Sequence, residues 1–225
     1  MTADIEVVEL VGPPGSGKSS VADAIGTPPG TVVLKEHHAA DLPALVWAAV
    51  AAGRPLLANP PSGVTRARWA AWLGRVGAAP RIVRRRRTVD MHVVVFDQGP
   101  VYTLARIAEA ADRSAAVRRW HQERLAECGR LLDAVVWLDA GPDLLVERIR
   151  ARSKRHRADA LTPAAARALV ERERAAIRDG VEALAALGVR VVELDAAQAL
   201  ERCVDAVRAV LEIDTPRADE MGGRA

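Results

Sequence analysis

Gly-Pro-Pro-Gly-Ser-Gly-Lys-Ser, at residues 12–19, matches the phosphate-binding pattern G-x-x-x-x-G-K-[ST] at every fixed position. The apolar run before it, residues 5–11, is rich in β-branched side chains, which is typical of a strand buried on both faces. A helical pattern follows over residues 20–25 and ends at Gly26. This strand–loop–helix context favours a phosphate-binding loop over a glycine turn with an incidental lysine.

The octapeptide predicts a site for nucleotide phosphates. Its glycines allow consecutive backbone N–H groups to point at an anion beside a helix N-terminus. The expected nucleotide contacts are Gly12, Pro13, Pro14, Gly15, Ser16, Gly17, Lys18, Ser19 and Ser20. Lys18 would reach the β- and γ-phosphates and Ser19 would ligate Mg²⁺, so ATP and Mg²⁺ are the expected cofactors.

Length and composition indicate one domain. The chain has 225 residues, and we expect a single P-loop kinase-like domain at residues 1–213, with a charged tail without regular structure at 214–225. The longest apolar run, residues 44–52, is too short to cross a bilayer, and no secretory signal is visible. Cys128 and Cys203 are isolated, which argues against a disulfide framework or a zinc site. We therefore expect a cytoplasmic protein without a membrane partner, and the oligomeric state stays open, a homodimer included.

Short apolar runs alternate with helical patterns along the chain. Expected strands lie at residues 5–11, 31–34, 91–96, 134–138 and 189–194. Expected helices lie at residues 20–25, 42–52, 64–76, 101–111, 114–131, 142–152, 163–187 and 197–211. This order predicts an α/β protein with the P-loop NTPase fold: a five-stranded parallel sheet, helices on both faces and an arginine-rich lid. Ligands of such sheets lie beyond the carboxyl ends of the strands.

Two acidic residues follow predicted strands and would reach that edge. Asp97 ends the third strand, as expected of a Mg²⁺-binding carboxylate, although an aspartate can also simply start the turn through Gly99. Glu36 ends the second strand, where it could accept a proton from a substrate hydroxyl or stay an exposed carboxylate. Of the adjacent His37 and His38, at most one would face a site.

Two arginine clusters receive different interpretations. Arg148, Arg152 and Arg155 are spaced i, i+4 and i+7, which would place them on one helical face. We expect a lid at about residues 148–160, in which Arg148, Arg152 and Arg157 close over ATP and stabilise charge in the transition state, with a solvated basic helix as the alternative. The four arginines at residues 84–87 precede a strand and are expected to form a solvated basic patch, with contact with an anionic partner as the alternative.

Aromatic residues are few. The chain has one Phe and one Tyr, so the interleaved aromatics expected of a nucleic-acid partner are missing. Trp69 and Trp72 are spaced i, i+3 and are expected to pack a helix on the core, with a substrate pocket as the second interpretation. We therefore expect no nucleic-acid partner.

The pattern resembles the thymidylate kinase and deoxynucleoside kinase families of P-loop kinases. Beyond the phosphate loop, Val-Trp-Leu-Asp-Ala-Gly-Pro-Asp at residues 136–143, with Glu147-Arg148-Ile149 and the arginines after it, is similar to the strand, helix and lid of thymidylate kinases. Val-Val-Glu-Leu-Asp-Ala-Ala-Gln at residues 191–198 is similar to their last strand and adenine-side loop. The resemblance implies that Arg148 and Ala197 contact the nucleotide.

The acceptor side departs from these families. Thymidylate kinases carry Asp-Arg after the third strand, whereas here Asp97 is followed by Gln98. Lys-Glu-His-His at residues 35–38 replaces their Arg-Glu-Pro-Gly-Gly segment, and it puts Glu36 where deoxynucleoside kinases have a catalytic glutamate. The resemblance therefore implies the ATP side of the reaction and leaves the acceptor open.

The sequence as a whole predicts an ATP-dependent phosphotransferase. The expected catalytic residues are Lys18, Glu36, Asp97, Arg148 and Arg152, and the expected metal ligands are Ser19 and Asp97. The acceptor expected first is a nucleoside or nucleoside monophosphate. A non-nucleotide acceptor and a regulatory P-loop ATPase are the alternatives, although the single asparagine, Asn59, excludes the Asn-Lys-x-Asp guanine signature.

Overall fold

The structure, a computed structural model, describes residues 6–26, 28–35, 39–86, 91–110, 114–152 and 156–211. Several predicted features lie outside the described residues: Glu36, His37, His38, Arg87, Arg155 and the tail at 214–225. Within the described ranges, no helix combines the length and the apolar character needed to cross a membrane.

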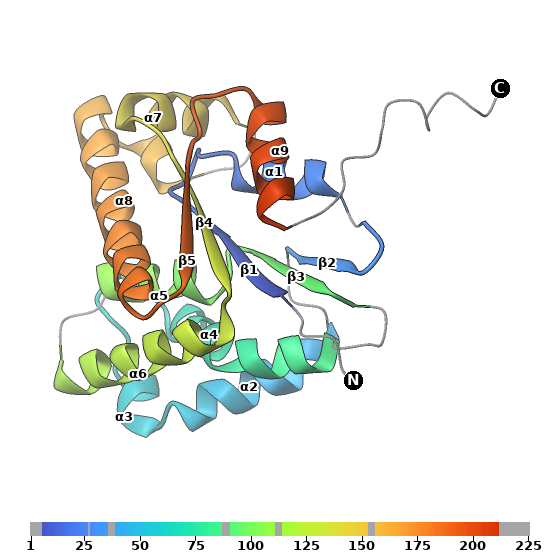
Figure 1. The fold of residues 1–225 in the computed structure, drawn as a ribbon. Coiled ribbons are helices and arrows are strands. Elements are labelled where there is room, and N and C mark those ends of the chain that lie inside the picture. The colour runs from blue at the N-terminus through green and yellow to red at the C-terminus, as the bar shows by residue number, and fades with distance from the viewer. Residues whose placement is uncertain are drawn as a thin grey trace.

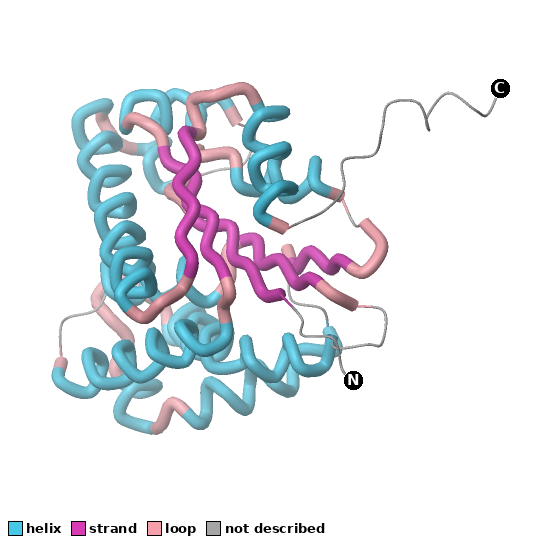
Figure 2. The backbone as a smooth tube through the Cα atoms, viewed as in Figure 1, coloured by secondary structure: helices cyan, strands magenta, loops and turns pink. Residues whose placement is uncertain are grey.

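A five-stranded parallel sheet forms the centre of the molecule, in the order β2-β3-β1-β4-β5. Figure 2 shows its strands side by side in magenta. The strands are β1 (Glu6–Val11), β2 (Thr31–Leu34), β3 (Val93–Asp97), β4 (Ala134–Asp139) and β5 (Arg190–Asp195). In the central pairings Leu10 is opposite Asp97 and Val11 is opposite Trp137. The predicted sheet is confirmed, and it brings the ends of β1 and β3 to one edge.

Helices cover both faces of the sheet (Figure 1). They are α1 (Lys18–Ile25), α2 (Leu42–Ala51), α3 (Arg54–Ala58), α4 (Arg66–Arg86), α5 (Pro100–Ala110), α6 (Ala115–Leu131), α7 (Pro142–Ala151), α8 (Pro163–Ala186) and α9 (Leu200–Val210), with short 3₁₀ turns η1 (Ala39–Asp41) and η2 (Arg157–Ala160). Side chains of β1 alternate between two buried clusters. Val7 and Val11 pack toward α4, α5 and α6, whereas Val8 and Leu10 pack toward α1, α7 and α9.

Helix α4 is longer than the sequence pattern predicts. It does not end near residue 76 but continues through Pro80 to Arg86. Proline removes one backbone hydrogen bond, yet Ile82 and Val83 beyond it are buried, and this burial offsets the loss. The neighbouring α2 approaches closely, because a Cβ added to Gly74 would lie 2.6 Å from the Leu45 carbonyl oxygen.

This extension places the arginine run on a helix. Its first three arginines form the last turn of α4, where Arg84 and Arg85 are exposed, as predicted for a solvated patch, and Arg86 is half-buried. Arg85 donates to the Ala40 carbonyl oxygen at 3.0 Å, and Arg86 pairs with the almost fully buried Asp41 at 3.1 Å. These arginines therefore fasten α4 to the start of α2.

The lid helix is shorter than predicted. Helix α7 ends at Ala151, and the backbone of Arg152 is extended, with φ −84° and ψ 153°. Arg148 and Arg152 therefore do not share one face of a continuous helix, which corrects the i, i+4, i+7 arrangement. After this point the described chain resumes at His156, which is the N-cap of η2. Thr162 is the N-cap of α8, as predicted.

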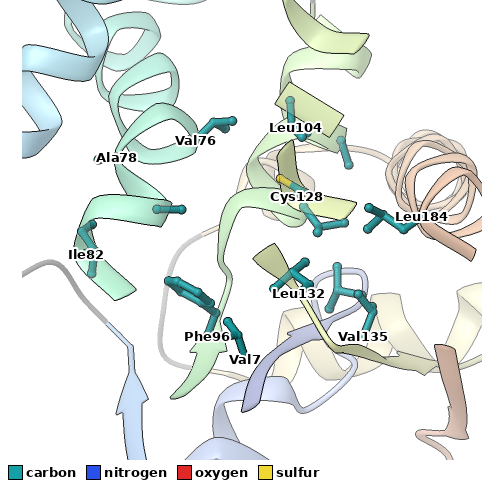
Figure 3. Packing of buried hydrophobic residues seen from close by; sticks show 14 of the residues in the cluster. Val7, Val76, Ala78, Ile82, Phe96, Leu104, Cys128, Leu132, Val135 and Leu184 are labelled. Carbon is teal, nitrogen blue, oxygen red and sulfur yellow. The ribbon is translucent and has the colours of Figure 1, made fainter. Parts of the chain in front are cut away.

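The larger buried cluster joins the sheet to α4, α5, α6 and α8. Figure 3 shows Val7, Phe96 and Val135 from the sheet beside Ile82, Leu104 and Leu184 from the helices. Trp69 is fully buried in this cluster, and its indole N–H donates to the Leu56 carbonyl oxygen at 2.7 Å. The core interpretation of Trp69 is confirmed, and a place in the wall of a pocket is excluded by its burial.

We expect Trp69→Phe to lower the free energy of unfolding by about 1–3 kcal/mol, because the buried Leu56 carbonyl loses its donor. Chemical denaturation followed by circular dichroism measures the change. The matched control is Trp47→Phe, at a side chain that is 53% exposed, which should stay within about 0.5 kcal/mol of the wild type. Equal effects of the two substitutions would contradict this account of Trp69.

Candidate nucleotide and acceptor site

The loop between β1 and α1 has the backbone that a phosphate site requires. Gly15 and Gly17 have φ of +87° and +84°, which side-chain-bearing residues rarely adopt. A Cβ on Gly12 would collide with the Leu138 carbonyl oxygen. Gly17 starts α1 without a side-chain cap, and no acidic residue lies in the first turn. The free N–H groups and the helix dipole therefore favour a bound anion.

Lys18 is held inside this loop. Its Nζ donates to the carbonyl oxygens of Gly12 at 2.7 Å and Pro13 at 3.2 Å, and it lies 5.3 Å from the centroid of the Tyr102 ring. Burial lowers the pKa of Lys18 to about 8, partly offset by the negative charges of Asp97 and Glu173. A buried ammonium has lost its contacts with water, so a bound anionic ligand would stabilise its positive charge.

Ser19 and Asp97 are brought together from different elements. The hydroxyl of Ser19 donates to the Asp97 carboxylate, and this bond lowers the pKa of Asp97, although burial raises it more. Asp97 Oδ1 is buried and has no hydrogen-bond partner. A hydroxyl and an orphaned carboxylate oxygen, both hard oxygen donors, fit Mg²⁺.

Within the described ranges, no group of three or more His, Cys, Asp or Glu side chains is placed to hold a metal ion. In proteins Mg²⁺ usually keeps several water ligands and binds through one or two carboxylates together with substrate phosphates.

Glu9 is a site residue that the sequence interpretation missed. It lies in the middle of β1, on the face that packs toward α5, and is fully buried. Its carboxylate accepts the N–H groups of Val101 and Tyr102, each at 2.9 Å, and a further N–H from Gly99. A glutamate among valines and leucine in a strand buried on both faces was the available signal, because a buried acid needs partners.

Glu9 holds the turn that follows Asp97. In this turn Gln98 has φ +61°, a strained conformation for a residue with a side chain. Gly99 leaves no room for a side chain, because its Cβ would lie 2.8 Å from Glu9 Oε2. The buried carboxylate thus caps α5 and keeps Asp97 at the end of β3.

The predicted lid arginines have separate positions. Arg148 donates to the Ala196 carbonyl oxygen at 2.7 Å, beside Ala197 on the loop after β5. Arg152 is close enough to Lys18 for its charge to lower the pKa of that lysine. Arg157 pairs with Glu109 and, together with Arg106, with the buried Glu173. The nucleotide contacts of Arg148 and Ala197 therefore remain predictions on the adenine side, and the charge of Arg157 is already balanced.

A cavity of about 1040 Å³ opens beside the phosphate loop. Its floor includes Ser19, Lys35, Asp97 and Gln98, and its walls are α2 and α4. The predicted position of Glu36 is next to Lys35 in the chain, but Glu36 itself lies outside the described residues. The cavity therefore joins the predicted metal ligands to a space that can hold a second molecule.

Glu9 generates a pH-dependence that can be measured. Burial raises the pKa of Glu9 to about 8 from an ordinary value of 4.5, although three backbone N–H groups act in the opposite direction. Between these two values the folded chain keeps a proton that the unfolded chain releases, so stability falls as pH rises. We expect the unfolding free energy of wild type relative to Glu9→Gln to fall from about pH 5 to about pH 8. Denaturant titrations at each pH test this, and a difference that rises or stays constant would contradict it.

The comparisons with known proteins agree with this geometry. No curated protein matches the chain. A family model described as an AAA domain matches residues 7–184, which include β1, the phosphate loop, Asp97 and most of α8. The parallel sheet and the loop geometry are those of P-loop NTPases, which bind nucleoside triphosphates. The chain therefore belongs to this AAA domain family, with the P-loop NTPase fold.

Proposed function

We propose that the protein is a Mg²⁺-dependent kinase that transfers the γ-phosphoryl group of ATP to a small-molecule acceptor. One observation carries the proposal: Ser19 and Asp97, which fit the metal of a bound nucleotide, also line the large cavity to which α2 and α4 contribute side chains. The proposed ATP site and the space for an acceptor would therefore meet at Ser19 and Asp97. Phosphoryl transfer requires this proximity and little further covalent chemistry.

The residues of the phosphate loop would bind and orient the donor. Loop N–H groups and the Lys18 ammonium would hold the β- and γ-phosphates, with Tyr102 supporting the lysine. Ser19 and Asp97 would hold Mg²⁺, which neutralises charge on the phosphoryl oxygens when bound. Glu9 acts indirectly, by fixing the turn after Asp97.

Two carboxylates are candidates for receiving the acceptor proton. Asp97 faces the cavity and has a raised pKa, so it can serve as a base if the metal leaves one of its oxygens free. Glu36 is the base implied by the resemblance to deoxynucleoside kinases. Its place in the chain, directly after Lys35 of the cavity floor, supports that role.

The lid would contribute at two points. Arg148 and Ala197 lie together beside the loop after β5, which favours contact with the adenine side of ATP. Arg152 is close enough to Lys18 for their charges to interact, and from there its charge would stabilise the transferring phosphoryl group.

The acceptor class is the finer part of the proposal. The resemblance favours a nucleoside or nucleoside monophosphate, but the cavity walls are largely apolar, and among the described lining residues the one aromatic side chain, Phe96, is only 4% exposed. A base would therefore find little aromatic surface for stacking. This favours the non-nucleotide alternative, and the large cavity itself disfavours a regulatory ATPase without an acceptor.

Release of ADP from ATP, measured against nucleosides, nucleoside monophosphates and non-nucleotide alcohols, tests the proposal. We expect one class of acceptor to accelerate ADP release, and Lys18→Ala to reduce that rate by about 100-fold or more, since it removes a charge from the transferring phosphates. Arg68→Gln, at an exposed side chain of α4 outside the cavity, is the control. Hydrolysis at one rate with every acceptor, or full activity of Lys18→Ala, would contradict the kinase.

A further inference from the structure

The α2 wall of the cavity is entirely apolar. Its lining residues are Leu42, Leu45, Val46, Ala49 and Val50, spaced i, i+3, i+4, i+7 and i+8 on one helical face. Leu42, Val46 and Val50 are 59%, 55% and 64% exposed, so this face is left uncovered by the residues that the structure describes. A ligand that covers it gains about 25 cal/mol for each Å² of apolar surface removed from water.

The part of the cavity wall that α4 contributes carries one cation among small or apolar side chains. Ala71, Arg75, Ala79 and Ile82 line the cavity at i, i+4, i+8 and i+11 of that helix. The residues one turn before and one turn after Arg75 are alanines, whose side chains are short. Ile82 lies near Phe96 of the cavity floor in Figure 3, so this wall continues into the sheet edge.

Arg75 differs from Lys35, the other described cation of the cavity lining, because Arg75 has no acidic partner among the described residues. Lys35 forms an ion pair with Asp23, and Asp41 pairs with Arg86. The exposed Arg75 side chain has no hydrogen bond or ion pair with the residues that the structure describes. A guanidinium beside apolar walls binds an anionic group with strong, directional hydrogen bonds.

We propose that the cavity binds an organic anion: an apolar body lies against α2, and a carboxylate or other acidic group pairs with Arg75. Binding of such a molecule follows from the cavity alone. Its identification as the phosphoryl acceptor rests on the proposed kinase function, with the reacting group directed toward Asp97 and Ser19 at the floor.

Two fluorescent probes of nearly equal apolar body test this assignment directly. Anilinonaphthalene sulfonate carries an anionic group, whereas N-phenylnaphthylamine is its uncharged counterpart. We expect Arg75→Gln to weaken binding of the sulfonate by about 10-fold, as for loss of a charge-assisted hydrogen bond, and to change binding of the neutral probe less than about 2-fold. Val46→Ser should weaken both probes, because it removes apolar contact on α2.

Two control variants decide where the probes bind. Arg68→Gln changes an arginine of α4 outside the cavity, and Arg81→Gln changes one that lines a separate groove beside Trp47. Neither should alter binding of the sulfonate. Thermal melting checks folding, and Arg75 should be replaceable without loss of stability, because it is exposed and has no partner among the described residues. An unchanged ratio of the two probe affinities in Arg75→Gln, or an equal loss in Arg81→Gln, overturns the proposal.

Turnover separates this inference from the kinase function. With matched alcohols that carry either a carboxylate or its amide, we expect the carboxylate to be the better acceptor, and Arg75→Gln to raise its KM about 10-fold with little change in kcat. Probe binding that depends on Arg75 without any acceptor-dependent ADP release would sustain the organic-anion site and reject the kinase. Acceptor-dependent turnover that requires Lys18, together with probe affinities that Arg75→Gln does not change, would support the kinase and reject the organic-anion site.

Discussion

Parallel pairing of β1 with β3 is the constraint on which the site depends. It sets Leu10 opposite Asp97, so the phosphate loop after β1 and the carboxylate at the end of β3 share one edge of the sheet. The same strand supplies Glu9, whose carboxylate holds the N–H groups at the start of α5. A one-residue slip of β1 would turn Glu9 to the other face and release the turn after Asp97.

Buried ionisable side chains concentrate around this edge. Lys18, Asp97, Glu9 and Glu173 are all nearly inaccessible to water. Three of them are stabilised by backbone groups or by oppositely charged neighbours: Lys18 by loop carbonyls, Glu9 by N–H groups and Glu173 by two arginines. Asp97 keeps a buried oxygen without a partner, which is costly unless a ligand satisfies it. The arrangement is therefore suited to a cation that arrives with its nucleotide.

Features set by local pattern could be predicted from the sequence. The phosphate loop, the five parallel strands and the helix start at Thr162 follow from glycine spacing, β-branched runs and capping residues. Asp97 was found because a strand end has a known place in a parallel sheet. The resemblance to thymidylate and deoxynucleoside kinases added expectations about Arg148, Ala197 and Glu36 that remain predictions.

Features set by tertiary contact could not be predicted from the sequence. Helix α4 passes Pro80 because the side chains beyond it are buried against the sheet, which no helix pattern reveals. The lid arginines had the spacing of one helical face, but the chain leaves the helix at Arg152. Arg75 was one arginine among many, and only the cavity distinguishes it from the others. Glu9 had a signal as an acid in an apolar strand sequence, but its partners on α5, Val101 and Tyr102, are 92 and 93 residues away.

Titration of ATP with and without Mg²⁺, on the wild type and on Asp97→Asn, tests the central claim most directly. If Ser19 and Asp97 hold the metal of a nucleotide bound at the phosphate loop, Mg²⁺ will tighten ATP binding to the wild type by about 10-fold or more, and will have much less effect on the variant. Equal enhancement by Mg²⁺ in both proteins, or no binding of ATP to the wild type, would contradict the account.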